Sequence, residues 1–261
     1  AKFTLESGIL ENTCSTEDGF ATISGNGYRH NTEIVINGGT VKATGKHAIY
    51  QPQDGKITVN GGTIEGITGI EIRSGELTVN GGTIIGTGTT VKSTANGSGT
   101  TTVGAGIAIA QHGTEKDINV VVEGGTIQGY AALYQSNPEG NQTVDNVNIE
   151  VNGGEFEAIK GGTEAVYSED KTDFITGGTF SSDVSDYVAT NMDAVEDEDG
   201  NVYVGTLHTI TVEKTENGKV TASLEEAVVG QTITLTVEAA KGYELKSLTA
   251  NGTDVKDNKF V

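Results

Sequence analysis

The chain has 261 residues, a formal net charge of −20 and 38 glycines, but only 2 prolines, 1 cysteine and no tryptophan. The acidic balance excludes binding to nucleic acid or to an anionic membrane surface through a basic patch, and the single cysteine excludes an intramolecular disulfide framework and a cysteine-based zinc site. No apolar run reaches membrane-spanning length. Regular aliphatic and threonine-rich segments between the glycines favour short strands joined by tight turns, and therefore an all-β fold.

The N-terminal segment carries weak signals. AKFTLESGIL has no basic stretch followed by a long apolar core, so no signal peptide is predicted there. Cys14 has no histidine or asparagine partner in a recognisable context, and we expect it to pack as a small apolar side chain. The stretch LESGILENTCSTEDGFATISGNG fits the pattern described next only loosely, and a first coil or a cap is expected there.

From residue 34 onward, a strand, a Gly-Gly turn and a second strand recur along the chain. The first copies read IVINGGTVKA, ITVNGGTIEG and LTVNGGTIIG. The Gly-Gly pairs begin at Gly38, Gly61, Gly81, Gly124, Gly153 and Gly177. Because Asn and Gly accept positive φ at little cost, each pair predicts a tight corner. Recurrence at intervals of roughly 20 to 40 residues indicates a solenoid.

A third strand recurs after these two. Its copies are HAIYQ from His47, GIEIR from Gly69, GIAIA from Gly106, AALYQ from Ala131 and EAVYS from Glu164. Three strands per turn predict a three-sided coil whose parallel strands stack about 4.8 Å apart. The threonines that follow the corner are expected to form a column, made of Thr40, Thr63, Thr83, Thr126 and Thr179.

Long loops are predicted on both sides of the third strand. Residues 87–105 are rich in Gly, Ser and Thr and precede the third strand of one coil, while a loop beginning at Gln111 follows that same strand and a loop beginning at Gln135 follows the third strand of the next coil. The outer face of the third strand is therefore expected to lie in a groove.

This pattern resembles the right-handed parallel β-helix of the pectin-lyase-like superfamily over roughly residues 20–180. The resemblance implies a right-handed, three-sided parallel β-helix at residues 1–180. It also implies that polysaccharide would bind in the groove along the third strand.

Residues 181–205 are predicted to close the end of the solenoid, whose open strand edges would otherwise pair with other chains. Ser182 or Asp183 is expected to cap a short helix that places Val184, Tyr187 and Val188 on one face. A hairpin with Asp199-Gly200 at its turn should follow, pairing Ala194-Val195 with Val202 to Val204. The phrase GGTFSSDVSDYVA is similar to a terminator found after such coils in large bacterial surface proteins, especially Gram-positive ones.

Beyond Gly205 the Gly-Gly turns cease and an alternating apolar pattern begins. The phrases GKVTAS, GQTITLTV and KGYELKSLTANG resemble the divergent internalin-type B repeat, a small β module of bacterial surface proteins. The resemblance implies a B-repeat-like module at residues 206–261 that is incomplete at Val261, since the family ends with one more strand.

The outward face of the third strand is the candidate binding surface. If Glu71 faces solvent, the matching parity turns outward Ile49, Ala108, Leu133 and Val166 and, two residues along, Gln51, Arg73, Ala110, Gln135 and Ser168. Tyr50, Tyr134 and Tyr167 then point inward, and the opposite parity is the alternative. The candidate ligand-binding residues are His47, Gln51, Glu71, Arg73, His112, Tyr130 and Gln135.

Catalytic chemistry has only a thin basis in these residues. The resemblance implies either acidic calcium ligands with a basic residue, as in the lyases, or several neighbouring Asp residues, as in the hydrolases. Of the charged residues on the third strands, only Glu71 and Arg73 share a face. Glycoside hydrolysis usually needs two carboxyl groups, and this face offers one. An isolated surface ion pair is therefore the plainer interpretation. His47 and His112 lack a nucleophile or metal partner and are expected to be solvent-facing loop residues. No metal site or other cofactor is predicted, and calcium has no specific motif, since EDEDGN at residues 196–201 suits a hairpin turn better than an EF-hand.

Together these features predict a non-catalytic, adhesin-like bacterial protein that is secreted or attached to the cell wall, with its β-helix as a rigid stalk or a glycan-recognition surface. A polysaccharide or host glycan is the expected partner, and neither nucleic-acid binding nor membrane insertion is expected. The protein is expected to be a monomer and part of a longer chain. The alternative is a polysaccharide lyase or glycoside hydrolase acting in the groove, which depends on the fold resemblance alone.

Overall fold

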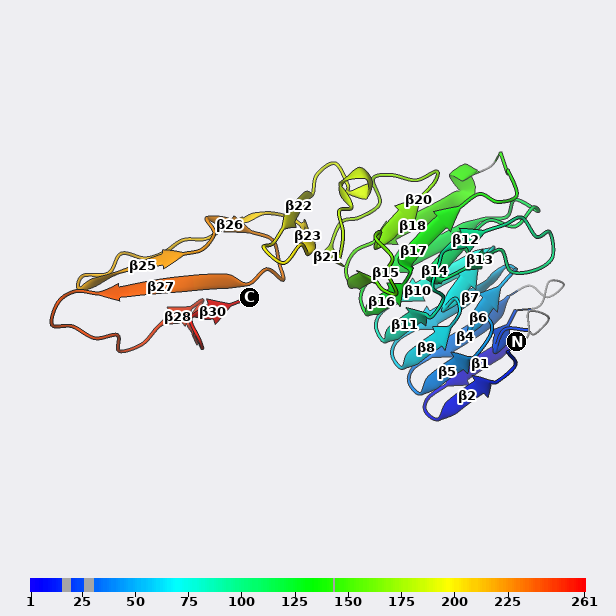
Figure 1. Ribbon diagram of the computed structural model, residues 1–261, viewed down its shortest axis with the longest axis horizontal. Helices are drawn as coiled ribbons and strands as arrows, with labels where there is room; N and C mark the ends of the chain where they lie inside the picture. Colours follow the sequence, from blue (N-terminus) through cyan, green and yellow to red (C-terminus); the bar gives the residue numbers. More distant parts are fainter. Residues whose placement is uncertain (16–19, 26–30, 143) are drawn as a thin grey trace.

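The computed structural model describes residues 1–15, 20–25, 31–142 and 144–261, and its regular structure is almost entirely β-strand. Stacked coils form the larger body, and the remaining strands extend away from one end of the stack (Figure 1). The predicted all-β class and the solenoid of parallel strands are confirmed. Part of the loosely fitting N-terminal stretch lies outside the described residues.

Three sheets form the sides of the solenoid, and every pairing between successive coils is parallel. Sheet A contains β1 (Lys2–Leu5), β4 (Thr32–Ile36), β7 (Gly55–Val59), β10 (Gly75–Val79), β15 (Ile118–Val122) and β18 (Val147–Val151). Sheet B contains β2 (Ile9–Asn12), β5 (Thr40–Ala43), β8 (Thr63–Gly66), β11 (Thr83–Gly86), β16 (Thr126–Gly129), β19 (Glu155–Ala158) and β21 (Gly178–Phe180). Sheet C contains β3 (Ile23–Ser24), β6 (Ile49–Gln51), β9 (Ile70–Ile72), β14 (Ala105–Ala110), β17 (Ala131–Ser136) and β20 (Val166–Ser168).

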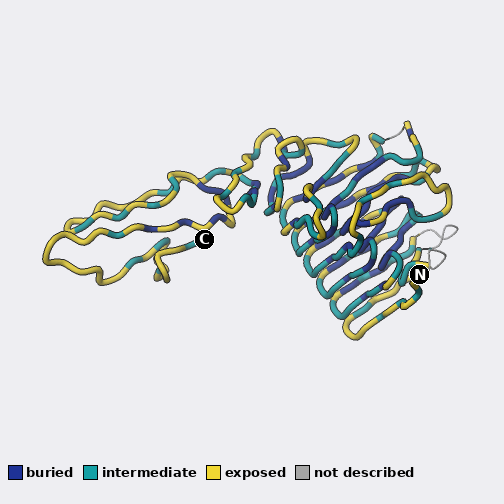
Figure 2. Tube along the Cα trace, viewed as in Figure 1, coloured by how far each residue is buried: buried dark blue, intermediate teal, exposed yellow. Residues whose placement is uncertain are grey.

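The core of the solenoid consists of columns of aliphatic side chains. Strands alternate between inward and outward residues, so equivalent inward positions of successive coils stack on one another. One such column in sheet A contains Ile34, Ile57, Leu77, Val120 and Ile149, all of them buried. The buried residues run without a break through the stack, whereas the extending strands are mostly exposed (Figure 2).

The Asn-Gly-Gly corners join sheet A to sheet B, and close stacking explains their second glycine. Gly62 has φ +82°, and a Cβ there would lie 2.6 Å from the carbonyl oxygen of Gly39 in the preceding coil. Only glycine combines this backbone conformation with so close an approach. The threonine column beyond the corner is present, in the register Thr40, Thr63, Thr83 and Thr126, with Glu155 standing between Thr126 and Thr179.

A ladder of asparagine side chains runs up the outside of the same corners. The Nδ2 group of Asn80 donates to Oδ1 of Asn60 at 2.7 Å, and that of Asn60 donates to Oδ1 of Asn37 at 2.8 Å. Nδ2 of Asn37 donates in turn to the carboxylate of Glu6. Each of these three corners is thus tied through its side chain to the coil before it.

The predicted register of sheet C is wrong by one residue in three coils. Ile49 pairs with Ile70, Leu133 pairs with Ile107, and Val166 pairs with Leu133, so all three predicted outward residues are buried in the core. The residues that share the outward column of Glu71 are Tyr50, Ala108, Tyr134 and Tyr167. HAIYQ and AALYQ carry apolar residues at both parities, and a shift of one residue exchanges the two faces of a strand.

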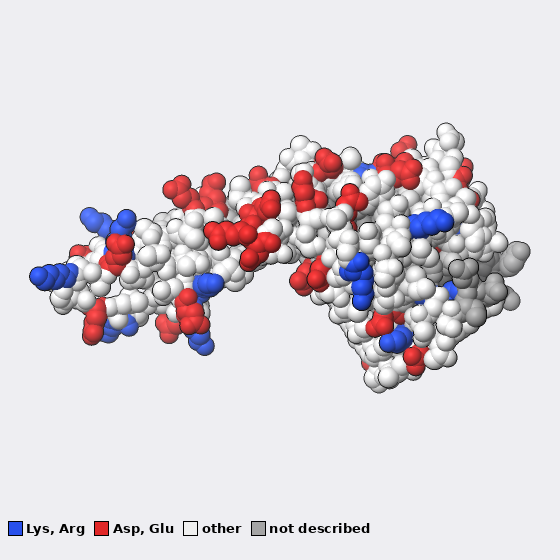
Figure 3. Space-filling view, viewed as in Figure 1, with Lys and Arg blue, Asp and Glu red and all other residues white. Residues whose placement is uncertain are grey.

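The end of the solenoid is closed by a hairpin, as predicted. β22 (Asp193–Glu196) pairs with β23 (Val202–Gly205), and β23 lies antiparallel to β21 at the edge of sheet B. The predicted short helix is a single 3₁₀ turn, η2 (Ser185–Tyr187), and Asp183 accepts the Ser185 N–H at 2.9 Å. Acidic side chains gather where the hairpin meets the outer strands (Figure 3), which suits an edge that must not pair with another chain.

The outermost strands form small antiparallel sheets. They are β24 (His208–Thr209), β25 (Gly218–Ala222), β26 (Glu226–Ala227), β27 (Ile233–Ala239), β28 (Thr249–Ala250), β29 (Thr253–Asp254) and β30 (Lys259–Phe260). Two other pieces lie in the loops beside sheet C: the pair β12 (Lys92–Ser93) and β13 (Thr102–Val103), and the 3₁₀ turn η1 (Val144–Asn146).

Candidate functional site

The predicted groove along sheet C is occupied by the chain itself. Residues 87–104, here called the strap, carry the β12–β13 pair and cover the outward face of β9, where the amides of Thr101 and Thr102 contact Glu71. Both ends of the strap are held at one carbonyl, because the amides of Gly88 and Gly104 each donate to Ile67 O at 3.2 Å. The site that the sequence places on an open surface is therefore buried beneath the strap.

Glu71 points outward from β9, as predicted, but is 0% exposed. Its Oε1 accepts the Thr101 N–H at 2.8 Å, the Thr102 N–H at 3.3 Å and the Thr101 hydroxyl. A carboxylate that accepts several N–H and O–H groups suits a buried anion. The chemical role of Glu71 in this arrangement is to hold the strap.

His47 shares this buried cluster, which overturns its predicted place in an exposed loop. Its Nε2 lies 2.7 Å from Thr102 O and 2.9 Å from Glu71 Oε2, and the residue is 3% exposed. Since both neighbours are hydrogen-bond acceptors, we assign the proton to Nε2. Nδ1 is buried and has no hydrogen-bond partner among the described residues.

Arg73 is the second anchor of the strap and is also 0% exposed. Its Nη1 donates to the carbonyls of Asn96 and Gly99 at 2.6 Å each, and its Nε donates to Ala110 O at 3.3 Å. Its Nη2 donates to Glu139 Oε1 at 2.6 Å, and Glu139 also accepts the Asn96 N–H. The guanidinium thus joins β14, the strap and the loop after β17. Its planar array of N–H donors can bond several acceptors at once.

The field of Arg73 reaches two titratable neighbours. Burial raises the pKa of Tyr50 above its ordinary value, and Arg73 opposes that rise; the phenol donates to Gly99 O at 2.8 Å. Burial and, next, the charge of Arg73 lower the pKa of His112, whose Nδ1 accepts the Thr114 N–H at 3.1 Å. Of the two candidate histidines, His112 is the one that is partly exposed.

The remaining candidates do not converge with Glu71 and Arg73. Gln51 and Gln135 pair with Ile72 and Ile109, so they point toward the interior and are buried, contrary to the predicted parity. Gln135 Oε1 accepts the Ser168 hydroxyl at 2.7 Å. Tyr130 is partly exposed, at the start of the connection from β16 to β17.

An aromatic pair occupies the part of the outward column that the strap leaves partly open. Tyr134 and Tyr167 are half-buried and stack with ring centroids 4.9 Å apart and ring planes 19° apart. Burial raises the pKa of both phenols, and each is the other's neighbour in adjacent coils. The predicted parity places both tyrosines inward, whereas the alternative parity places them on the outward face, as in the structure.

The residues of the strap that grip the cluster were missed. Thr101, Thr102 and Asn96 lie in a Gly- and Ser-rich stretch whose pattern predicts a loop but not what the loop contacts. The available signal is an acid and a base, Glu71 and Arg73, in a repeat whose other copies are mostly apolar or uncharged there, because charges that become buried need partners.

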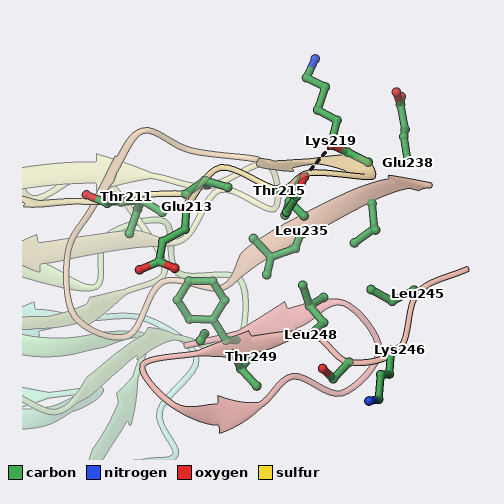
Figure 4. A pocket seen from close by; sticks show the side chains of 18 of the residues that line it. Thr211, Glu213, Thr215, Lys219, Leu235, Glu238, Leu245, Lys246, Leu248 and Thr249 are labelled. Atoms are coloured by element: carbon green, nitrogen blue, oxygen red, sulfur yellow. Dashed lines mark hydrogen bonds between the residues drawn. The ribbon is translucent and has the colours of Figure 1, made fainter. Parts of the chain in front are cut away.

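The outer strands enclose an open crevice with a volume of about 760 Å³ (Figure 4). Leu235 and Leu248 face it from opposite sides, and Phe260 also lines it. Glu213, Lys219 and Lys246 also line it (Figure 4). The crevice separates β27 from residues 244–248, so this part of the chain has an incompletely covered core.

In the described ranges, no group of three or more His, Cys, Asp or Glu residues is arranged to hold a metal ion. The same residues include no helix with the length and hydropathy required to cross a bilayer.

Comparison with known proteins identifies one segment. Residues 208–260 match the family model described as the divergent InlB B-repeat domain, which supports the predicted C-terminal repeat. No curated protein and no solved structure matches the chain. The family assignment therefore applies to the outer strands, and the match points to a bacterial surface protein.

Proposed function

We propose that this chain is a non-catalytic stalk of a bacterial surface protein, secreted or attached to the cell wall. In this proposal, the solenoid is a parallel β-helix of the pectin-lyase-like type, and it holds the B-repeat-like module at residues 206–261 away from its other end. The observation that carries the proposal is that the candidate catalytic residues, Glu71 and Arg73, are buried and hydrogen-bonded to the backbone of the strap.

Rigidity supports the same proposal. The aliphatic columns continue from the second coil to the terminal hairpin, and the strap ties β9, β14 and the loop after β17 together through Arg73. Close-packed interiors have low compressibility and transmit strain. A body built this way resists bending better than a string of flexible linkers.

Glycan recognition is the second candidate, and one observation favours it. The stacked rings of Tyr134 and Tyr167 lie on the outward face of sheet C beyond the strap. Tyrosine combines an apolar ring with a polar tip, which suits contact with a sugar. This function would add a ligand to the stalk and requires no turnover.

The test separates binding from cleavage. Purified protein is incubated with acidic and neutral polysaccharides, with and without calcium, while reducing ends and unsaturated products are followed. We expect no turnover with any of them. Turnover that disappears in Glu71→Gln or Arg73→Ala, in variants shown by circular dichroism to remain folded, would establish the lyase or hydrolase alternative.

Retention on immobilised glycans then distinguishes the two forms of the proposal. A pure stalk is retained by none. If retention occurs, Tyr134→Ala should weaken it, whereas Tyr203→Ala, which removes a half-buried tyrosine from the hairpin, should not.

A further inference from the structure

The corners of the solenoid contain a chemically labile sequence. In an Asn-Gly pair, the glycine amide nitrogen can attack the Asn side chain, because glycine offers no steric hindrance. The attack requires that the side chain swing over this nitrogen and that the nitrogen lose its proton. The chain contains several such pairs, at Asn37, Asn60, Asn80, Asn96, Asn152, Asn217 and Asn251, and one more at Asn26, outside the described residues.

Exposure does not distinguish these pairs. Asn37, Asn60, Asn80 and Asn96 all have exposed side chains. Their hydrogen bonds do distinguish them, since a side chain held by the neighbouring coils cannot swing unless the coils separate, and an amide whose proton is already donated is a poorer nucleophile.

The corner pairs are held by the neighbouring coils. Asn60 donates to Asn37 at 2.8 Å and accepts from Asn80 at 2.7 Å, so its carboxamide is fixed on both sides. The amide of Gly61 donates to Ile36 O at 3.3 Å, and Gly38 and Gly81 donate in the same way to the coil before them. Reaction at a corner therefore requires the stack to open locally.

Asn96 lies in the strap, and among the described residues its carboxamide is bonded to its own turn and to no neighbouring coil. Its side chain bonds only within its own turn: it donates to Thr100 O at 3.2 Å, at the upper end of the usual range, and accepts the Ser98 N–H at 3.4 Å, beyond that range. Gly97 donates its amide proton to no partner within the described part of the chain, and no atom beyond its neighbours lies within 4 Å of where a Cβ would be.

We infer that Asn96-Gly97 is a site of spontaneous deamidation and that stacking protects the corner Asn-Gly pairs from the same reaction. The Gly97 nitrogen gives its proton to solvent and forms a bond to Asn96 Cγ, the Cγ–Nδ2 bond breaks, and ammonia leaves. Water then opens the resulting ring at either carbonyl. The products carry an aspartate or an isoaspartate at position 96, and no oxidant or reductant is needed.

The reaction acts on the strap. Arg73 Nη1 holds the Asn96 carbonyl at 2.6 Å, and the Asn96 amide donates to Glu139 Oε1 at 2.9 Å. An isoaspartate reroutes the main chain through the side-chain carbon and displaces that carbonyl, while either product places a new carboxylate near Glu139. Conversion therefore loosens the grip of Arg73 on the strap.

The test follows every Asn-Gly peptide in one sample. The intact 261-residue protein is held at mildly alkaline pH, digested at intervals, and mapped by mass spectrometry. Asn96 should convert at least about tenfold faster than Asn60, a factor that corresponds to about 1.4 kcal/mol of local opening. In denaturant the two rates should become similar, since both are Asn-Gly pairs. Equal rates in the folded protein, or no conversion at Asn96, would overturn the inference.

The effect on the strap has its own readout and control. Hydrogen exchange at the Thr101 and Thr102 amides should be faster in converted protein than in fresh protein. Asn96→Gln is the matched control, because its longer side chain closes the ring far less readily, and its exchange should stay constant through the same incubation. Unchanged exchange after conversion of Asn96 would show that the strap does not depend on this linkage.

Discussion

At the scale of single residues, the chain uses its most reactive-looking side chains as anchors. Glu71 and His47 lie beneath the strap, where Glu71 accepts backbone N–H groups of the strap and His47 Nε2 faces the Thr102 carbonyl oxygen. Burying a charge is costly unless it is hydrogen-bonded, and the partners of both anchors include strap residues far away in sequence. Removal of one partner should therefore be felt in stability before it is felt in any binding assay.

Glu71→Gln should destabilise the protein by roughly 1–3 kcal/mol, the cost of leaving a buried polar group unsatisfied. The amide retains an acceptor for Thr101 N–H but places a donor against the Nε2–H of His47. The measurement is the free energy of unfolding, with hydrogen exchange at Thr101 as a local readout. Glu76→Gln is the control: its partner Lys56 is exposed, so the change should stay below about 1 kcal/mol.

Asp197 gives a pH dependence at the hairpin turn. The Asn201 N–H and, next among the favourable contacts, its side chain lower the pKa of this carboxyl below its ordinary value. A lowered folded-state pKa stabilises the protein above the unfolded-state pKa, near 3.9, and this contribution is lost as pH falls through the folded-state value. Asp197→Ala should therefore lower the melting temperature at neutral pH and have little effect in strong acid.

A matched variant isolates this effect. Asp199→Ala removes a carboxylate of equal charge from the same turn, but Asp199 contributes its backbone amide and not its carboxylate to the contact with Asp197. Melting curves for both variants across the acid range should diverge at neutral pH. Parallel curves would refute the role assigned to Asp197.

At the scale of elements, the corner is the unit that repeats, and its second glycine is its most constrained position. Gly62 combines φ +82° with a preceding coil so near that a Cβ would lie 2.6 Å from Gly39 O. Gly8 has a similar φ of +89° and nothing within 4 Å. A side chain at either position would strain the backbone, but only at Gly62 would it also clash with the preceding coil.

Gly62→Ala should destabilise the solenoid by about 1–3 kcal/mol more than Gly8→Ala, the usual range for forcing extra atoms into a packed site. Both variants incur the cost of a non-glycine residue at positive φ. Chemical unfolding of the two proteins under identical conditions measures the difference. Equal destabilisation would mean that the stacked carbonyl exerts no steric control at the corner.

The elements differ in how far the sequence predicts them. Asn-Gly-Gly and the aliphatic strands around it locate the corners and sheets A and B, because glycine conformation and alternation are local properties. Sheet C required a choice between two apolar parities in HAIYQ and AALYQ, and only packing against the next coil settles that choice. The contacts of the strap are remote in sequence, so burial of Glu71 and Arg73 could not be predicted from either pattern.

At the scale of the whole molecule, two bodies of unequal robustness are joined. The solenoid core extends through the stacked coils, whereas the buried apolar residues of the outer cluster are Ala227, Ile233 and Leu235. The crevice of about 760 Å³ leaves Leu248 and Phe260 only partly covered. Regions with few buried contacts open most readily.

The outer strands should consequently unfold before the solenoid. Limited proteolysis of the whole chain should cut first within residues 208–260 and leave a resistant product that ends near Gly205. Mass spectrometry of the time course identifies the order of cuts. Early cleavage between β7 and β15, with the outer strands still intact, would contradict this ranking.

The near-identity of the coils that begin at Ile57 and Leu77 has an evolutionary consequence. β7 and β10 pair residue for residue in parallel, so an extra copy of residues 57–76 inserted between them would meet the same neighbours on both sides. Unequal recombination between the two copies could add or delete one coil, about 4.8 Å of height, without disturbing the terminal hairpin. The height of such a protein is therefore open to selection in small, uniform steps.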